Sequence, residues 1–174
     1  MKTCKVCKSK FKPTYSTVQM VCSPKCAIEY SKQRKEKNNE KILKAKIDLE
    51  KAKSYQRTLL DARKYFQKWI RQRDSDKPCI SCGKHSKLVD AGHYFKAEVY
   101  SGLIFNEDNC HSQCRKCNRY KGGNESHYRL GLVERYGEDF VKALEQIKDE
   151  NRLKKWTKEE LVEIKTRYKN LLKK

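Results

Sequence analysis

Two groups of four cysteines constrain the fold of this chain more than any other feature. Each group is built from two close pairs, and the groups are Cys4, Cys7, Cys22 and Cys26, and Cys79, Cys82, Cys114 and Cys117. This spacing is typical of zinc sites, in which four thiolates surround one ion at about 2.3 Å and hold short loops together without a large core. We therefore expect two structural Zn²⁺ ions, each at the centre of a small module.

The composition agrees with small modules joined by helix. Charged residues make up 37% of the 174 residues and hydrophobic residues another 37%, so one large core is not expected. The formal net charge is +20, and a surface this basic binds polyanions, with nucleic acid as the first candidate. Residues 1–75 carry 21 Lys and Arg against 7 Asp and Glu, whereas residues 76–125 carry 8 against 6. This asymmetry predicts that DNA binding and the chemical reaction are carried out by different parts of the chain.

The sequence has no apolar run long enough to cross a bilayer, and it begins without a signal peptide. We therefore expect a cytoplasmic protein with no membrane partner. In that reducing compartment, paired cysteines are metal ligands far more often than disulfides.

Four parts of an α+β, mostly helical fold are predicted. They are a Cys4 zinc module at residues 1–28, a long basic helix at 29–73, a second zinc-stabilised module at 74–125 and C-terminal helices at 126–174. A hairpin-like stretch is expected from Phe11 to Val21. Ser23 is a suitable N-cap and Pro24 suits the first helical position, so the long helix should begin there.

The long helix is predicted because no Gly or Pro interrupts residues 30–73, which are rich in good helix formers. Steps of three and four residues define a seam, made of Ile42, Ala45, Leu49, Ala52, Gln56, Leu59, Arg63, Phe66 and Ile70. Such a repeat favours coiled-coil pairing, so we predict a homodimer, with the C-terminal helices of the same chain as the alternative partner. Four cations upstream of the seam are expected to contact DNA phosphates: Lys32, Arg34, Lys35 and Lys37.

The central module should contain two strands followed by a helix. We predict strands at residues 88–95 and 103–105, and then a helix that is entered at Asn109 and carries Cys114, Cys117 and Asn118 on successive turns. Beyond it, helices are expected to end at Tyr136 and near Lys148, and a capping box at Thr157 should begin the last one.

The motifs of this central module resemble those of a known protein family. The module contains a Cys-x2-Cys pair, a strand with Asp90 and His93, and then Asn109, Cys114, Cys117, Asn118 and Lys121. This pattern resembles that of the HNH, or ββα-metal, endonucleases of the endonuclease VII type. More narrowly, residues 90–94, 114–118 and 122–124 after an N-terminal four-cysteine module are similar to the NinG (Rap) recombination proteins of lambdoid phages. This resemblance spans nearly the whole chain. It implies a phage-encoded endonuclease for branched DNA such as Holliday junctions or D-loops, a homodimer that uses Mg²⁺ or Mn²⁺ in the bacterial host.

The motif assigns roles to four residues. His93 is the expected general base, because a neutral imidazole can take a proton from water near pH 7. Asn118 is the first expected ligand of the catalytic metal and Asp90 the second. The family motif places an acidic residue directly before the histidine, where this chain has Gly92. Asn109 is expected to orient His93 or to tie a loop.

Several alternatives stay open at this point. His111 or His127 can replace Asp90 as a metal ligand, and Asn109 can simply cap a helix. Cys110 is expected to pack as a small hydrophobe, and Lys116, Arg119 and Lys121 are expected to contact phosphates. Two other functions fit the sequence: a zinc-containing DNA-binding recombination accessory protein without catalysis, and an HNH nuclease with sequence preference.

Overall fold

The computed structural model describes residues 1–173, which belong to two compact units, Met1–Ser54 and the chain from Tyr55 onward. The fold is mostly helical with two small two-stranded sheets, as predicted. Helix α1 (Pro24–Arg73) contributes residues to both units. Within residues 1–173, no helix combines the length and the apolarity that a membrane span requires.

The first unit begins with a small hairpin around the first cysteine pair. Strands β1 (Lys2–Thr3) and β2 (Lys10–Phe11) pair antiparallel. The hairpin predicted at residues 11–21 is therefore wrong, because that stretch is a loop in which the Gln19 side chain accepts hydrogen bonds from the Thr14 and Tyr15 amides. Ser23 Oγ accepts a hydrogen bond from the Cys26 amide at 3.3 Å, which confirms the predicted cap at the start of α1.

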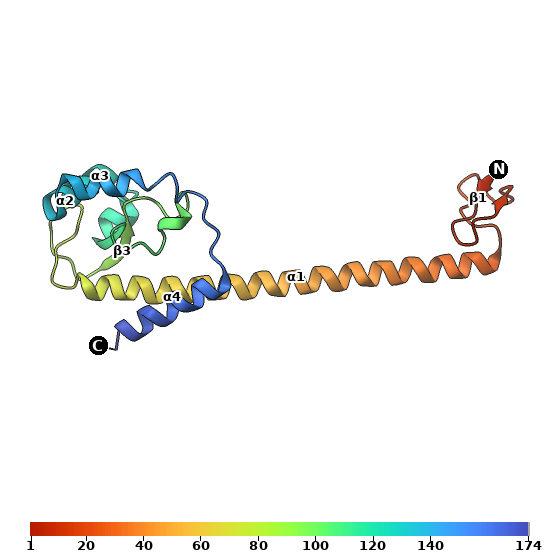
Figure 1. Ribbon diagram of the computed structural model, residues 1–174, viewed down its shortest axis with the longest axis horizontal. Helices are drawn as coiled ribbons and strands as arrows, with labels where there is room; N and C mark the ends of the chain where they lie inside the picture. Colours follow the sequence, from red (N-terminus) through yellow and green to blue (C-terminus); the bar gives the residue numbers. More distant parts are fainter. Residues whose placement is uncertain (174) are drawn as a thin grey trace. The chain divides into compact units, whose positions relative to one another are not determined.

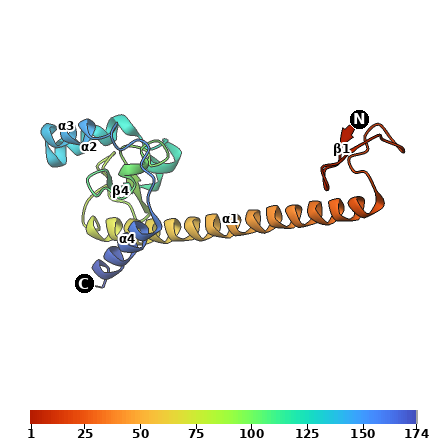
Figure 2. The same cartoon turned by 45° about the vertical axis from the view of Figure 1, so that its right-hand side comes forward.

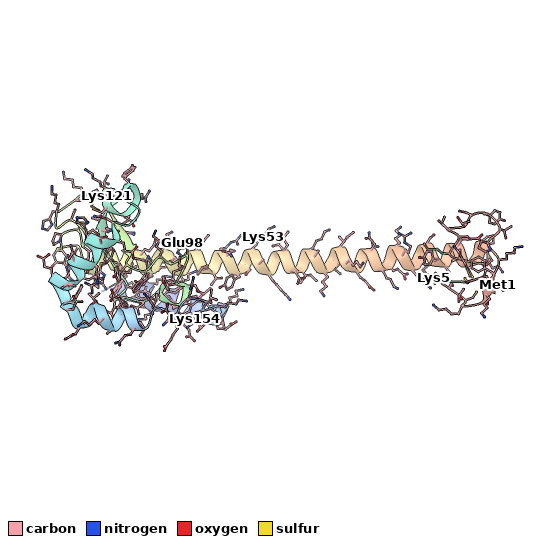
Figure 3. All side chains as sticks on the ribbon, turned by 90° about the horizontal axis from the view of Figure 1, so that it is seen from above. Met1, Lys5, Lys53, Glu98, Lys121 and Lys154 are labelled. Carbon is pink, nitrogen blue, oxygen red and sulfur yellow. The ribbon has the colours of Figure 1, made fainter. Side chains whose placement is uncertain are left out.

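The first half of the seam is exposed in the first unit. Ile42 and Leu49 keep 46% and 54% of their surface accessible. Figure 3 shows the side chains projecting from α1 around Lys53. Pairing of this stretch with a second copy of the chain stays a prediction.

The second half of the seam packs within the chain. Phe66 and Ile70 are fully buried in one core cluster with Leu161 and Tyr168 of α4 (Lys158–Leu171), which lies alongside α1 in Figures 1 and 2. The Phe66 and Tyr168 ring centroids are 5.0 Å apart. The alternative partner of the seam, the C-terminal helix of the same chain, is therefore correct for this half. The capping box at Thr157 is confirmed.

The central sheet has a different second strand from the one predicted. Strand β3 (Val89–His93) pairs antiparallel with β4 (Cys110–Cys114), and His93 lies opposite Cys110. The predicted strand at residues 103–105 is wrong: Leu103 ends the short 3₁₀ helix η1 (Ser101–Leu103), Ile104 and Phe105 form a turn, and all three are buried in the core. All five β4 residues are buried although most are polar, so their sequence lacks the alternation that marks a half-exposed strand.

Helices cover both sides of this sheet. In Figures 1 and 2 the sheet lies between α1 and the pair formed by α2 (Glu125–Tyr136) and α3 (Glu138–Gln146). The predicted end at Tyr136 is confirmed, and α3 ends two residues before the predicted Lys148. Tyr128 of α2 is fully buried and donates its hydroxyl hydrogen to the Gly92 carbonyl at 2.8 Å, which fixes the helix pair to β3.

A buried carboxylate fixes the end of α1 to β4. The Asp74 carboxylate accepts hydrogen bonds from Arg73 at 2.8 and 2.9 Å, from Lys77 at 3.2 Å and from the Ser112 amide at 3.0 Å. Its side chain has no accessible surface. Every carboxylate oxygen therefore has a partner, as a buried charge requires.

Candidate functional site

The second cysteine cluster is contributed by three segments. Cys79 and Cys82 come from the loop after α1, Cys114 ends β4, and Cys117 lies in the short π-helix η2 (Lys116–Tyr120). The expected single helix carrying Cys114, Cys117 and Asn118 is therefore wrong for Cys114, which a strand holds. The four sulfurs lie within 4.8 Å of one another, and the Cys82 and Cys114 sulfurs are 3.9 Å apart. A tetrahedron with bonds of about 2.3 Å has sulfur separations of about 3.8 Å, so the cluster fits one metal ion such as Zn²⁺.

The first cluster has similar geometry. Its four sulfurs also lie within 4.8 Å, with Cys7 and Cys22 at 3.4 Å and Cys22 and Cys26 at 3.7 Å. These distances exceed the disulfide bond length of about 2.05 Å. Burial opposes ionisation of Cys4, but backbone hydrogen bonds from Val6 and Cys7 lower its pKa to about 6. The sulfur separations of both clusters therefore fit a metal ion held by four cysteines.

His93 and Asn118 line the same cavity of about 370 Å³. We call it the His93 cavity. His93 reaches it from β3, and Asn118 reaches it from η2, which Cys114 and Cys117 fix to the end of β4. The remaining walls come from α1, from β3 and the segment after it, from the loop after η2 and from the start of α2. Their residues are Arg63, Gln67, Ala91, Tyr94, Lys96, Ala97, Glu98, Gly122, Gly123 and Glu125.

His93 is held in a defined orientation and tautomer. Its Nε2 lies 3.0 Å from the Ile104 carbonyl oxygen, and its ring centroid lies 6.3 Å from that of Phe66. A carbonyl only accepts hydrogen bonds, so Nε2 carries the proton and Nδ1 keeps its lone pair. Burial lowers the pKa of His93 below its ordinary 6.5 and outweighs the opposing effect of the Ile104 carbonyl. The imidazole is therefore neutral near pH 7 and able to act as a base.

Asn109 ties the loop that holds His93. It is fully buried, its Oδ1 accepts a hydrogen bond from the Phe95 amide at 2.8 Å, and its Nδ2 donates to the carbonyls of Phe95 at 3.0 Å and Leu103 at 3.2 Å. Leu103 directly precedes Ile104, the acceptor for His93. Asn109 therefore does not cap a helix; it fixes the backbone that orients the imidazole.

Asp90 and Asn118 lie side by side. Asn118 Nδ2 donates to Asp90 Oδ2 at 3.2 Å, and Arg119 donates to both oxygens of the same carboxylate at 2.8 and 3.2 Å. Burial disfavours the charged form of Asp90, but the Arg119 hydrogen bond and charge keep its pKa lowered. Carboxylate and amide oxygens are ligands that suit Mg²⁺ or Mn²⁺, so the pair fits such an ion in its chemistry. A cation bound by Asp90 competes with Arg119, which was expected to contact phosphate and instead pairs with this carboxylate.

The structure explains why glycine stands directly before His93. A Cβ atom on Gly92 would lie 2.2 Å from Gln113 Oε1 and 3.0 Å from Gln113 Cβ. Gln113 is fully buried, and its Nε2 donates to Ser81 Oγ and to the Gly123 carbonyl, both at 2.6 Å. An acidic side chain at position 92 has no room, so the usual ligand position of the motif cannot be filled here.

Neither Asp90 nor the two alternative histidines are among the residues that line the His93 cavity, so the structure brings Asp90 to Asn118 but not into the cavity itself. His111 is buried, its Nδ1 is 3.3 Å from the Tyr128 hydroxyl, and burial with the nearby Arg73 charge lowers its pKa to about 3. His127 lines a separate hollow beside Cys79 and Cys82. Cys110 is fully buried within the apolar core, as expected.

The predicted phosphate contacts are exposed in both units. Lys116 and Lys121 are exposed around η2, and Lys121 projects outward in Figure 3. In the first unit the exposed cations of α1 include the four that were predicted, Lys32, Arg34, Lys35 and Lys37.

Five polar residues of the His93 cavity were not predicted for the site. They are Arg63, Gln67, Lys96, Glu98 and Glu125. Only Arg63 left a signal in the sequence, because it interrupts the apolar seam of α1.

Comparison with known proteins places the chain in one family. The family model described as Bacteriophage Lambda NinG protein matches residues 1–174. Protein ninG of Salmonella phage P22 is 36% identical, with 96% of this chain and 89% of that protein aligned. Protein ninG of Escherichia phage lambda is also 36% identical over 96% of this chain and 88% of the relative, and that of Escherichia phage 933W is 35% identical over 98% and 91%. No solved structure matches this chain. With matches that extend over nearly its whole length, the chain belongs to the NinG family of bacteriophage lambda.

Proposed function

We propose that this protein is a metal-dependent, structure-selective DNA endonuclease of phage recombination. Its HNH, or ββα-metal, core would consist of β3, β4 and η2, with Zn²⁺ in the cysteine cluster below them. The observation that carries this proposal is that His93 and Asn118, from separate segments, line one cavity. The preference for branched DNA, such as Holliday junctions and D-loops, rests on the family resemblance.

The orientation of His93 supports a role as general base. Its Nδ1 accepts a proton from a water molecule, and the water oxygen forms a bond to phosphorus as the bond to the 3′ oxygen breaks and that oxygen takes a proton from solvent. Asn118 and Asp90 are the residues that would hold Mg²⁺ or Mn²⁺. When bound, such an ion supplies positive charge for the phosphate oxygens and the leaving oxygen. Asn109 keeps the Ile104 carbonyl in place, so that Nε2 stays protonated and Nδ1 stays basic.

The exposed cations support binding to the DNA backbone. The predicted phosphate contacts of α1, Lys32, Arg34, Lys35 and Lys37, and the lysines around η2 would neutralise phosphates and release counterions, so affinity should fall steeply with salt concentration. Backbone contacts of this kind position DNA without reading its sequence. A substrate chosen by its branching agrees with that mode of binding.

The proposal is tested with His93→Ala on a four-way junction and on linear duplex of the same sequence. We expect the variant to lose at least about 100-fold in nicking rate with Mg²⁺ or Mn²⁺, at unchanged junction affinity. His85→Ala is the matched control, because His85 is exposed and lies outside the His93 cavity. Undiminished nicking by His93→Ala contradicts the mechanism. A wild-type protein that binds junctions without cutting is an accessory protein, and cleavage of linear duplex at a defined site indicates a sequence-preferring nuclease.

A further inference from the structure

Arg63 occupies a place in α1 where packing calls for an apolar side chain. It lies between Leu59 and Phe66 in the seam, and both of these residues pack in the core of the second unit. Arg63 itself is partly buried at the edge of this core. Gln67 lies one helical turn further along the same face, and both side chains line the His93 cavity. The aliphatic stems can cover the edge of the core, while the polar groups of both residues line the cavity.

The guanidinium of Arg63 is not committed to a carboxylate. None of the ion pairs within residues 1–173 includes Arg63, whereas Arg73, Arg119, Arg129 and Arg167 each pair with an acidic side chain. A planar guanidinium presents two parallel N–H donors, which match two oxygens of a phosphate group. The chemistry of this wall of the cavity therefore suits a phosphodiester.

We propose that Arg63 is a further catalytic residue, which binds the non-bridging oxygens of the scissile phosphate across the cavity from His93. Gln67 would donate its side-chain amide to the same stretch of backbone. This inference rests on the proposed nuclease function and gives α1 a direct part in it. The helix would then form one wall of the active site and bring a cation to the phosphate, where negative charge develops during hydrolysis.

The position of Arg63 also affects the base. Burial contributes most to the lowered pKa of His93, and the Arg63 charge lowers it further while Glu98 opposes it. The charged groups that share the cavity with His93 are Arg63 from α1, Lys96 and Glu98 from the segment after β3, and Glu125 from α2. Removing the Arg63 charge should therefore raise the pKa of His93 and move the acidic limb of the pH–rate profile to higher pH.

The test compares Arg63→Gln with Arg57→Gln. Arg57 is exposed on the same helix and does not line the cavity, so the control removes the same charge away from His93. Nicking of a four-way junction is measured in single turnover at saturating protein with Mg²⁺, from about one pH unit below to about two units above the ordinary histidine pKa of about 6.5. We expect Arg63→Gln to be slower by about 100-fold with its acidic limb shifted upward, and Arg57→Gln to match the wild type in both respects.

Each outcome decides between the claims. If the wild type nicks junctions and the two variants behave alike, this inference is wrong and the proposed function stands. If the wild type does not nick, both fail. A loss of junction affinity in Arg63→Gln with an unchanged saturated rate also overturns the inference, because Arg63 then only binds DNA. Should Arg63→Gln not fold, Arg63→Lys keeps the charge and stem but loses the paired donors, and a wild-type rate in that variant contradicts the proposal.

Discussion

Asp74→Asn is expected to destabilise the second unit, because Asp74 holds the end of α1 to β4 through a buried carboxylate. The substitution keeps the shape of the side chain and removes its charge. Arg73 and Lys77 then lose their anionic partner, and the Ser112 amide loses a charged acceptor. Because Asn fills the same volume and leaves no cavity, the change in stability reports the lost charge interactions and not a change in packing.

The size of the effect follows from the pKa of Asp74. Burial alone would raise this pKa, but the Arg73 hydrogen bond and the Ser112 amide lower it from 3.8 to about 2. A shift of this size corresponds to about 2 kcal/mol of stability. Because the folded-state pKa is depressed, this contribution is fully present above about pH 5 and is lost as the pH falls through about 2. The free energy of unfolding of Asp74→Asn should therefore be lower by about 2 kcal/mol at pH 7.

Tryptophan fluorescence during urea unfolding provides the assay. The chain has two tryptophans, Trp69 and Trp156, and both belong to the second unit, so the signal reports on that unit alone. Measurements at pH 6, 7 and 8 avoid the acid range in which cysteine thiolates are protonated and metal is released. Over this interval Asp74 stays ionised, so the difference between wild type and variant should be constant.

Asp76→Asn is the matched control. Asp76 is exposed two residues further along, and its substitution should change the free energy of unfolding by less than about 0.5 kcal/mol. If Asp74→Asn changes the free energy of unfolding at pH 7 by no more than Asp76→Asn does, the reasoning is refuted. The buried ion pairs would then only offset the cost of desolvating Asp74.

Two further predictions concern the strands and the metal clusters. Gly92→Ala should lower the free energy of unfolding by about 1–3 kcal/mol in the same urea assay, because the new methyl group meets Gln113, and a wild-type value would contradict the overlap. Cys117→Ser should reduce bound zinc from two ions to one per chain, measured by metal analysis of the purified protein, whereas Cys110→Ser should keep two, and retention of both ions by Cys117→Ser would exclude the assigned ligand set.

Local signals made much of the helical structure predictable. The Ser23 cap, the absence of Gly and Pro up to Arg73 and the capping box at Thr157 each act over a few residues, so the sequence alone determines them. The cysteine clusters were predictable for a similar reason, since the ligand spacing within each pair is local. The shared cavity of His93 and Asn118 followed from the family motif and could not be obtained from spacing.

The errors arose where tertiary contacts decide the structure. Residues 103–105 are apolar and were predicted as a strand, but they fill the core from a turn. Strand β4 is buried and mostly polar, and it is held by partners far along the chain, such as Asp74, whose carboxylate accepts a hydrogen bond from the Ser112 amide. The seam of α1 was predicted as one surface, but within residues 1–173 its second half packs in a core cluster whereas Ile42 and Leu49 of its first half are exposed. Periodicity reveals that a face is apolar, but not which element covers it.

The end of α1 is hydrogen-bonded to alternate residues of β4, the strand that pairs with β3. Arg73 donates to the Cys110 carbonyl at 2.9 Å, Asp74 accepts from the Ser112 amide, and the loop after them brings its cysteines to Cys114. Strand β3, with His93, is paired to this anchored strand, so the position of His93 relative to α1 is set from the helix terminus. Arg63 lies ten residues before Arg73 on the same helix, about 15 Å along its axis. One residue inserted between them would rotate Arg63 by about 100° around the helix and away from the cavity. The uninterrupted helix before Arg73 therefore aligns Arg63, on one wall of the His93 cavity, with His93 on another.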